Sequence, residues 1–269
     1  MKKFELSGKT AIVTGASSGI GKNLCFLLKE NGVKKIIGAA RSEEKLNAVK
    51  KELGDVFIPF VTDVSLRAEW QKLRDFVLSE NCGADIIINC AGVLPKFSDF
   101  KNCRDGDVET ITAINYFSIV YSAEYILPVL RESGDGLMIN VASSSALCPF
   151  GKVSLYSASK AAAERFSECL SCEEKTVSVV TVLPGFTKTD VMRNQIMTER
   201  DLKLVNKISA PLDKTCRKIL KKAIKRKKRI ITGLDAELMN LGYGLMPAKT
   251  PRIITETLEK SSIDAFGDE

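Results

Sequence analysis

Tyr156 and Lys160 are the residues of this sequence whose types and spacing favour proton chemistry. They stand four positions apart, so a helix through them would place both on one face. A free tyrosine titrates near pH ~10 and a free lysine near pH ~10.4. An ammonium close to a phenol lowers the phenol pKa toward the range in which it can exchange protons. The pair alone does not identify a site, because ordinary solvent-exposed helix faces carry the same spacing.

The absence of histidine excludes several common kinds of catalytic and metal site. None of the 269 residues is a histidine, which excludes Ser-His-Asp triads, Cys-His pairs and histidine metal sites. The eight cysteines form no dense framework, as is usual for reduced thiols in a cytosolic protein. Cys169 and Cys172 have the spacing of a metal or redox pair, but no second pair accompanies them. We therefore expect these two to be buried thiols, and we expect no metal site.

Seven short apolar segments, mostly separated by helical patterns, must position the pair. The predicted strands are 10–14, 35–40, 56–61, 84–89, 137–141, 177–183 and 229–232, and helices are expected at 22–31, 42–53 and 66–78. Strands that are apolar nearly throughout indicate a sheet covered on both faces. The fold predicted is α/β, a single doubly wound Rossmann-type domain over residues 1–269 with a mostly parallel seven-stranded sheet.

The composition fits such a domain: 45% of the residues are hydrophobic and 27% are charged, which is ordinary for a globular protein. No apolar run approaches the ~20 residues that span a bilayer. We expect a soluble, untargeted, cytoplasmic protein.

A glycine-rich turn, residues 14–21, follows the first predicted strand and opens a helix. Gly15 allows a tight turn, while Gly19 and Gly21 leave room for a diphosphate and for close helix packing. The free N–H groups of the helix start attract phosphate. This turn predicts a dinucleotide site at the carboxyl ends of the strands.

The turn and several later motifs resemble the short-chain dehydrogenase/reductase family (classical type). Thr-Gly-x-x-x-Gly-Ile-Gly is that family's glycine pattern, and residues 89–92 resemble its Asn-Asn-Ala-Gly motif, with Cys90 in place of the second Asn. Residues 62–64 resemble its adenine-binding segment, and Ser143 lies 13 positions before Tyr156, the family spacing. The resemblance extends over residues 7–246 with every landmark in order.

The resemblance implies hydride transfer between a nicotinamide cofactor and a carbonyl or alcohol carbon, with Tyr156 exchanging the proton. Lys160 is expected to bind the nicotinamide ribose and lower the Tyr156 pKa, Ser143 to bond the substrate oxygen, and Asn115 to hold a water that re-protonates Lys160. Ser144 stays open as an alternative to Ser143. The implied catalytic residues are Asn115, Ser143, Tyr156 and Lys160, and the implied cofactor-binding residues are Gly15, Ser17, Ser18, Gly19, Ile20, Gly21, Arg41, Ser42, Asp63, Val64, Asn89, Ala91, Gly92, Tyr156, Lys160, Pro184, Gly185, Thr187 and Thr189.

The end of the second strand favours NADP (NADPH) over NAD. NAD sites usually place a carboxylate there for the ribose hydroxyls, whereas this sequence has Ala40, Arg41 and Ser42. A guanidinium forms charge-assisted bonds with the 2′-phosphate of NADP. Lys22 is a further candidate for this contact.

The substrate is expected to be a hydrophobic carbonyl or alcohol compound, such as a steroid or a long-chain acyl ketone. The pocket should come from the loop region 186–210, with contributions from 146–155 and 93–100. Its expected apolar lining comprises Leu147, Cys148, Pro149, Phe150 and Phe186. The C-terminal segment 233–269 begins with an apolar stretch, 233–247, which resembles the late segment of family members acting on steroids and long-chain ketones. Core packing and a subunit interface remain alternatives for that stretch.

Residues 217–229 include nine Lys or Arg residues and no acid, and we expect one amphipathic basic helix there. It is either a solvated helix packed on the sheet or a weak membrane-surface contact through anionic lipid. Nucleic-acid binding is not expected, because few aromatic residues interleave the charges.

We also expect a homo-oligomer. The alternative function is a dinucleotide-sensing protein of the same fold without turnover.

Overall fold

One seven-stranded sheet forms the centre of the computed structural model, which describes residues 2–79, 83–189 and 209–260. The strand order is β3-β2-β1-β4-β5-β6-β7, and every pairing in it is parallel. The strands are β1 (Thr10–Thr14), β2 (Lys35–Ala40), β3 (Phe57–Val61), β4 (Ile86–Asn89), β5 (Gly136–Val141), β6 (Val177–Pro184) and β7 (Arg229–Thr232). The predicted doubly wound fold is confirmed, and each strand lies within two residues of its predicted bounds.

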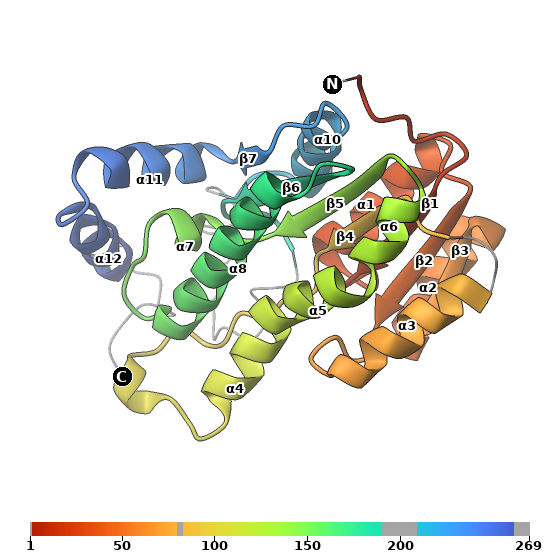
Figure 1. Ribbon diagram of the computed structural model, residues 1–269. Coiled ribbons are helices and arrows are strands. Elements are labelled where there is room, and N and C mark those ends of the chain that lie inside the picture. Colours follow the sequence, from red (N-terminus) through yellow and green to blue (C-terminus); the bar gives the residue numbers. More distant parts are fainter. Residues whose placement is uncertain (1, 80–82, 190–208, 261–269) are drawn as a thin grey trace.

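Helices cover both faces of this sheet (Figure 1). They are α1 (Gly19–Glu30), α2 (Glu43–Leu53), α3 (Arg67–Ser79), α4 (Asp107–Thr112), α5 (Ser118–Tyr125), α6 (Leu127–Glu132), α7 (Ser144–Leu147), α8 (Ser154–Glu173), α10 (Leu212–Ala223), α11 (Leu234–Leu245) and α12 (Thr250–Lys260). Because strand side chains alternate between faces, Ile86 and Ile88 pack with α1, α2 and α10, whereas Ile87 packs with α3, α6 and α8. The two resulting cores hold the sheet from both sides.

The strand order reverses between β1 and β4. β2 and β3 lie on one side of β1, and β4 to β7 follow on the other. In doubly wound sheets this reversal opens a crevice at the carboxyl ends of the strands. The segments that carry the predicted chemistry leave the sheet at that edge: the turn after β1, the ends of β2 and β3, and the loops after β4, β5 and β6.

The basic segment 217–229 is not one helix, so that prediction is wrong. α10 ends at Ala223, the chain turns, and Arg229 begins β7. Arg226 adopts a left-handed backbone (φ 57°), a conformation that a helix cannot continue. Its guanidinium donates to Ser178 and to the carbonyl of Lys2. The basic side chains therefore spread over a helix, a turn and a strand.

Two further features concern the outer surface. Cys169 and Cys172 are exposed on α8, not buried as expected, because they lie on the solvent side of that helix. α11 and α12 lie beyond the β7 edge of the sheet (Figure 1). Among the residues described, no helix is both long and apolar enough to cross a bilayer.

Candidate active site

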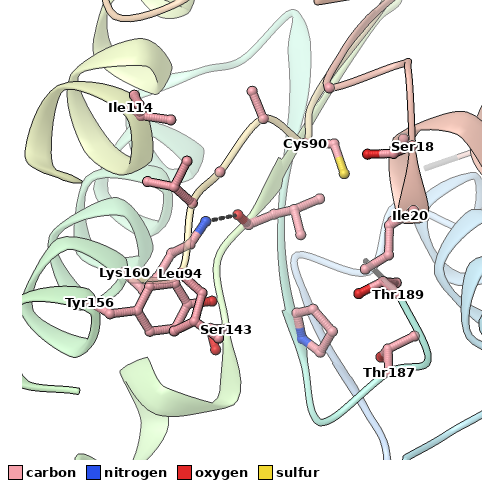
Figure 2. Close-up of a pocket in the computed structure, with 18 of the residues that line it drawn as sticks. Ser18, Ile20, Cys90, Leu94, Ile114, Ser143, Tyr156, Lys160, Thr187 and Thr189 are labelled. Atoms are coloured by element: carbon pink, nitrogen blue, oxygen red, sulfur yellow. Dashed lines mark hydrogen bonds between the residues drawn. The ribbon is translucent and has the colours of Figure 1, made fainter. Parts of the chain in front are cut away.

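A cavity of about 540 Å³ occupies the carboxyl edge of the sheet. Figure 2 shows Ser143, Tyr156 and Lys160 on one side of it, and Ser18, Ile20, Thr187 and Thr189 on the other. The predicted residues that line it are Gly15, Ser17, Ser18, Gly19, Ile20, Gly21, Arg41, Ser42, Asp63, Val64, Ala91, Gly92, Ser143, Tyr156, Lys160, Pro184, Gly185, Thr187 and Thr189. The fold thus gathers most of the residues implied by the motifs around one cavity.

The glycines of the β1–α1 turn allow close backbone contacts. Gly15 has a left-handed φ of 67°. A side chain at Gly21 would place its Cβ 2.4 Å from the Gly15 carbonyl oxygen, which no other residue tolerates. Thr14 ties this turn to the loop after β4, because its Oγ1 accepts hydrogen bonds from the N–H groups of Cys90 (3.0 Å) and Ala91 (3.1 Å).

Basic and hydroxyl side chains border the cavity at the end of β2. Ser42 caps α2, where its Oγ accepts from the Lys45 N–H (3.3 Å), and Lys45 joins Arg41 on the lining. Asp63 is the one acid among the lining residues that the structure describes, and its Oδ1 accepts from the N–H and hydroxyl of Ser65. This end of the cavity therefore suits an anion.

Lys22 does not contribute to that basic end. It lies outside the lining, and its Nζ is 2.8 Å from Glu52.

Ser143 and Tyr156 meet through the short helix α7 and the start of α8. Ser143 caps α7, and its Oγ accepts from the N–H (3.2 Å) and the hydroxyl (3.0 Å) of Ser145. Burial raises the pKa of Tyr156, and a hydrogen bond with Ser143 opposes that rise. Ser144 does not line the cavity, so the geometry favours Ser143 over the alternative that the sequence left open.

Lys160 is almost fully buried, and its Nζ donates to the carbonyl of Val141 at 3.1 Å, the dashed contact in Figure 2. Burial lowers the Lys160 pKa to about 8. The expected lowering of the Tyr156 pKa by Lys160 is not found, because burial of the phenol dominates and Ser143 alone opposes it. At neutral pH the phenol therefore keeps its proton.

Two predicted site residues, Asn115 and Asn89, do not line the cavity. Asn115 lies in a π-helical segment, Ala113–Phe117, and its amide bonds the Val93 backbone twice: Oδ1 accepts from the N–H (2.8 Å) and Nδ2 donates to the carbonyl (3.0 Å). Asn89 ends β4 and donates to Asn140 Oδ1 (2.8 Å), its register partner on β5. These side chains hold the loop and the sheet together.

Asp235 is a site residue that the motifs did not reveal. It lies in the first turn of α11, and its Oδ2 accepts from the Phe186 N–H at 2.7 Å. Its carboxylate oxygens stand 2.2 Å from where a Cβ at Gly185 would be. Burial raises the pKa of Asp235. The carboxylate thus fixes the 184–186 turn at the rim of the cavity.

Apolar side chains also line the cavity, and Figure 2 shows one of them, Leu94, beside Tyr156. The others include Phe97, Phe150, Val153 and Phe186. Leu147 and Pro149 line a second cavity instead, and Cys148 is buried. Residues 190–208 of the predicted substrate loop lie outside the described residues.

The comparisons with known proteins agree with this geometry. Residues 9–200 match the family model for short chain dehydrogenase. An uncharacterized oxidoreductase of Staphylococcus haemolyticus is 37% identical over 202 residues, which cover 73% of this chain and 83% of the relative. 11-beta-hydroxysteroid dehydrogenase A of Sesamum indicum is 30% identical over 244 residues, covering 85% of this chain and 69% of the relative.

A solved structure shows the same fold. It is a short-chain dehydrogenase/reductase from Burkholderia phymatum in complex with NAD, with a TM-score of 0.77, 20% identity and 96% coverage of both chains. The family match spans most of this chain, and Ser143, Tyr156 and Lys160 line one cavity. The chain therefore belongs to the short-chain dehydrogenase/reductase family and is an NAD(P)-dependent oxidoreductase.

Proposed function

We propose that this protein interconverts a ketone and a secondary alcohol, with NADP as its cofactor and a hydrophobic molecule such as a steroid or a long-chain acyl ketone as its substrate. One observation carries the proposal. A single cavity is lined both by Ser143, Tyr156 and Lys160 and by Arg41, which follows β2. The first three suit proton transfer to a carbonyl oxygen, and the arginine suits a phosphate.

The bound nicotinamide would supply or accept the hydride, and the side chains manage the oxygen and its proton. In the reductive direction Tyr156 donates its proton to the substrate oxygen. The Ser143 hydroxyl bonds the same oxygen, a contact that strengthens as negative charge develops there. Lys160 binds the cofactor ribose through its ammonium.

Asn115 takes a supporting role in this scheme. Because its amide is bonded to the Val93 backbone, we assign that side chain to positioning the loop after β4. The predicted water that re-protonates Lys160 stays part of the proposal.

The raised pKa of Tyr156 supports reduction at neutral pH, because a proton donor must hold its proton before the reaction. Oxidation of the alcohol needs the phenolate, which forms only at higher pH.

The choice of NADP rests on the end of β2. Arg41 is exposed, forms no ion pair within the described residues and borders the cavity together with Ser42 and Lys45. A 2′-phosphate would gain two cations there, and Ala40 ends β2 where an NAD site usually has a carboxylate for the ribose hydroxyls.

The substrate class rests on the apolar side chains that line the cavity and on the hydroxysteroid dehydrogenase among the relatives. Phe97, Phe150 and Phe186 supply aromatic surface that suits a flat or extended apolar molecule.

The test combines a substrate panel with a cofactor comparison. Steroid ketones, long-chain acyl ketones and small carbonyls are each supplied with NADPH or NADH, and loss of reduced-cofactor absorbance is followed. We expect turnover of an apolar ketone with NADPH, and at least ten-fold weaker NADPH binding in Arg41→Ala. Arg104→Ala, an exposed arginine off the cavity, is the matched control. Tighter binding of NADH than of NADPH by the unmodified protein contradicts the cofactor assignment.

A further inference from the structure

The loop 148–153 joins α7 to α8 and forms part of the wall of the active-site cavity. Phe150 and Val153 line that cavity, and Tyr156 follows in the first turn of α8. Phe150 also lines the second cavity, so it contributes to the walls of both. The position of this loop therefore decides how the Phe150 side chain meets a substrate.

One residue of the loop has a backbone conformation that needs support from outside. Lys152 adopts a left-handed φ of 65°, which residues other than glycine rarely adopt. Such a conformation persists only where the surrounding contacts fix it. One contact comes from the loop after β4, where the Ser98 N–H donates to the Lys152 carbonyl at 3.0 Å. Another comes from α12, on the Phe150 side of Lys152.

Thr255 on α12 supplies that contact. Its Oγ1 accepts from the Gly151 N–H at 2.8 Å, across 104 positions of the chain, and donates to the Pro251 carbonyl at 2.8 Å. Figure 1 shows α12 beside the loop. A Cβ at Gly151 would lie 2.7 Å from Cγ2 of Thr255, so the helix can approach this closely only because residue 151 is glycine.

α12 is itself anchored to the body of the protein. Thr250 is buried at its start, with Oγ1 2.7 Å from the Gly242 carbonyl oxygen and 2.9 Å from that of Met246, which ties α12 to α11. α11 contacts α7 and β7, and Asp235 in its first turn accepts from the Phe186 N–H. Both helices lie beyond residue 200, where the match to the family model ends, so the family motifs do not assign these contacts.

We propose that Thr255 is a positioning residue that sets substrate preference by holding Phe150 in the cavity wall. This rests on the proposed function, because the Phe150 ring matters to an apolar substrate. The Gly151 N–H belongs to the peptide that joins it to Phe150, so its bond to Thr255 fixes the backbone next to the ring. Without that bond a bulky apolar substrate loses its contact with the ring, whereas cofactor binding and proton transfer by Tyr156 continue.

The test compares Thr255→Val with Thr257→Val, since valine keeps the shape of threonine and removes its hydroxyl. Thr257 is the matched control because it is exposed on the same helix and its hydroxyl donates to the Ile253 carbonyl within α12. Thr255→Val should raise the KM of a steroid or long-chain ketone about ten-fold, the effect of one lost hydrogen bond. Turnover number, NADPH affinity and the KM of a small carbonyl should stay within about two-fold, as should every constant of Thr257→Val.

A second pair of variants tests the same contact through the threonine methyl group. Gly151→Ala should also raise the KM of the bulky ketone, because the new Cβ would meet Cγ2 of Thr255. In Gly151→Ala/Thr255→Ser the serine lacks Cγ2 and keeps the hydroxyl, so this KM should return close to that of the unmodified protein. This rescue decides the matter should Thr255→Val fail to fold. A double variant no better than Gly151→Ala overturns the proposal.

Amide exchange at Gly151, followed by NMR, separates this proposal from the proposed function. Thr255→Val should speed that exchange about ten-fold, and Thr257→Val should leave it unchanged. Equal exchange in the two variants, or an equal rise in KM for small and bulky carbonyls, overturns the proposal. Failure of the unmodified protein to reduce any ketone contradicts the proposed function instead.

Discussion

Replacement of Lys160 by methionine should stabilise the protein at neutral pH while removing its activity. Burial lowers the Lys160 pKa from 10.5 to about 8, so its charged form is disfavoured by roughly 3 kcal/mol. Methionine has a similar length and no charge, but it cannot donate a hydrogen bond to the Val141 carbonyl. The loss of that bond offsets about 1–2 kcal/mol of the stabilisation gained by removing the buried charge. We expect the free energy of unfolding to rise by about 1–2 kcal/mol at pH 7.

The pH dependence fixes the cause of that gain. The folded-state pKa of Lys160 is depressed, so the destabilisation by its charge is complete below pH 8. It fades as the pH rises from about 8 to 10.5, because the folded protein releases its proton before the unfolded chain does. The stability advantage of Lys160→Met should therefore be largest at pH 7 and shrink across this window.

Urea unfolding at pH 7, 8.5 and 10 measures this difference. Lys214→Met, an exposed lysine on α10, is the control and should change stability little at any of these pH values. A Lys160→Met protein less stable than the unmodified chain at pH 7, or an advantage that stays constant with pH, would refute the reasoning.

Three further predictions concern the cavity. Ser143→Ala should lower turnover about 100-fold, whereas turnover by Ser144→Ala should stay within a few-fold of the unmodified protein. Equal losses of turnover in steady-state kinetics would reject the assignment of Ser143 over Ser144. Asp235→Ala should weaken NADPH binding about ten-fold, because it frees the Phe186 N–H. Asp235→Asn keeps an acceptor oxygen and should weaken binding less. If fluorescence titration gives both variants the NADPH affinity of the unmodified protein, Asp235 is not a positioning residue. Because burial raises the pKa of Tyr156, the rate of alcohol oxidation should climb beyond pH 9 while ketone reduction stays level from pH 6 to 8; a pH–rate profile that plateaus near neutrality argues against a protonated phenol.

Local patterns were enough to predict most of the sheet and the cavity. The β1–α1 turn and the segment from Ser143 to Tyr156 are short stretches of chain. Their backbone conformation depends mainly on residues that are close in sequence. Since parallel strands end at one edge, motifs that follow successive strands meet there. The sequence therefore predicts the place where Gly15, Arg41 and Tyr156 converge.

Local sequence patterns could not predict contacts between segments that are far apart in the chain. Asp235 is separated from Phe186 by 49 positions, and only the packing of α11 on the sheet edge brings them together. Asn115 matches a motif by position, but the π-helical turn directs its amide to Val93. Likewise, the direction of the Lys160 ammonium toward Val141 depends on β5, not on the four-residue spacing from Tyr156.

The basic segment 217–229 shows a different limit of prediction from sequence. Counting charges over 217–229 predicts one helix, but the left-handed backbone at Arg226 ends it early. The amphipathic pattern covers only the part in α10, where Ile219 and Leu220 are buried. The apolar stretch 233–247, by contrast, forms α11, where Leu234, Leu238 and Leu245 are exposed.

Tyr156→Phe tests the central claim most directly. The variant and the unmodified protein are compared for NADPH binding by fluorescence titration and for single-turnover ketone reduction in a stopped-flow instrument. Loss of the phenolic hydroxyl should lower the reduction rate by about 1,000-fold, which lies within the usual 10²–10⁴-fold effect of one proton donor. NADPH affinity should stay within about three-fold. Unchanged reduction in Tyr156→Phe would contradict the assignment of Tyr156 as the proton donor.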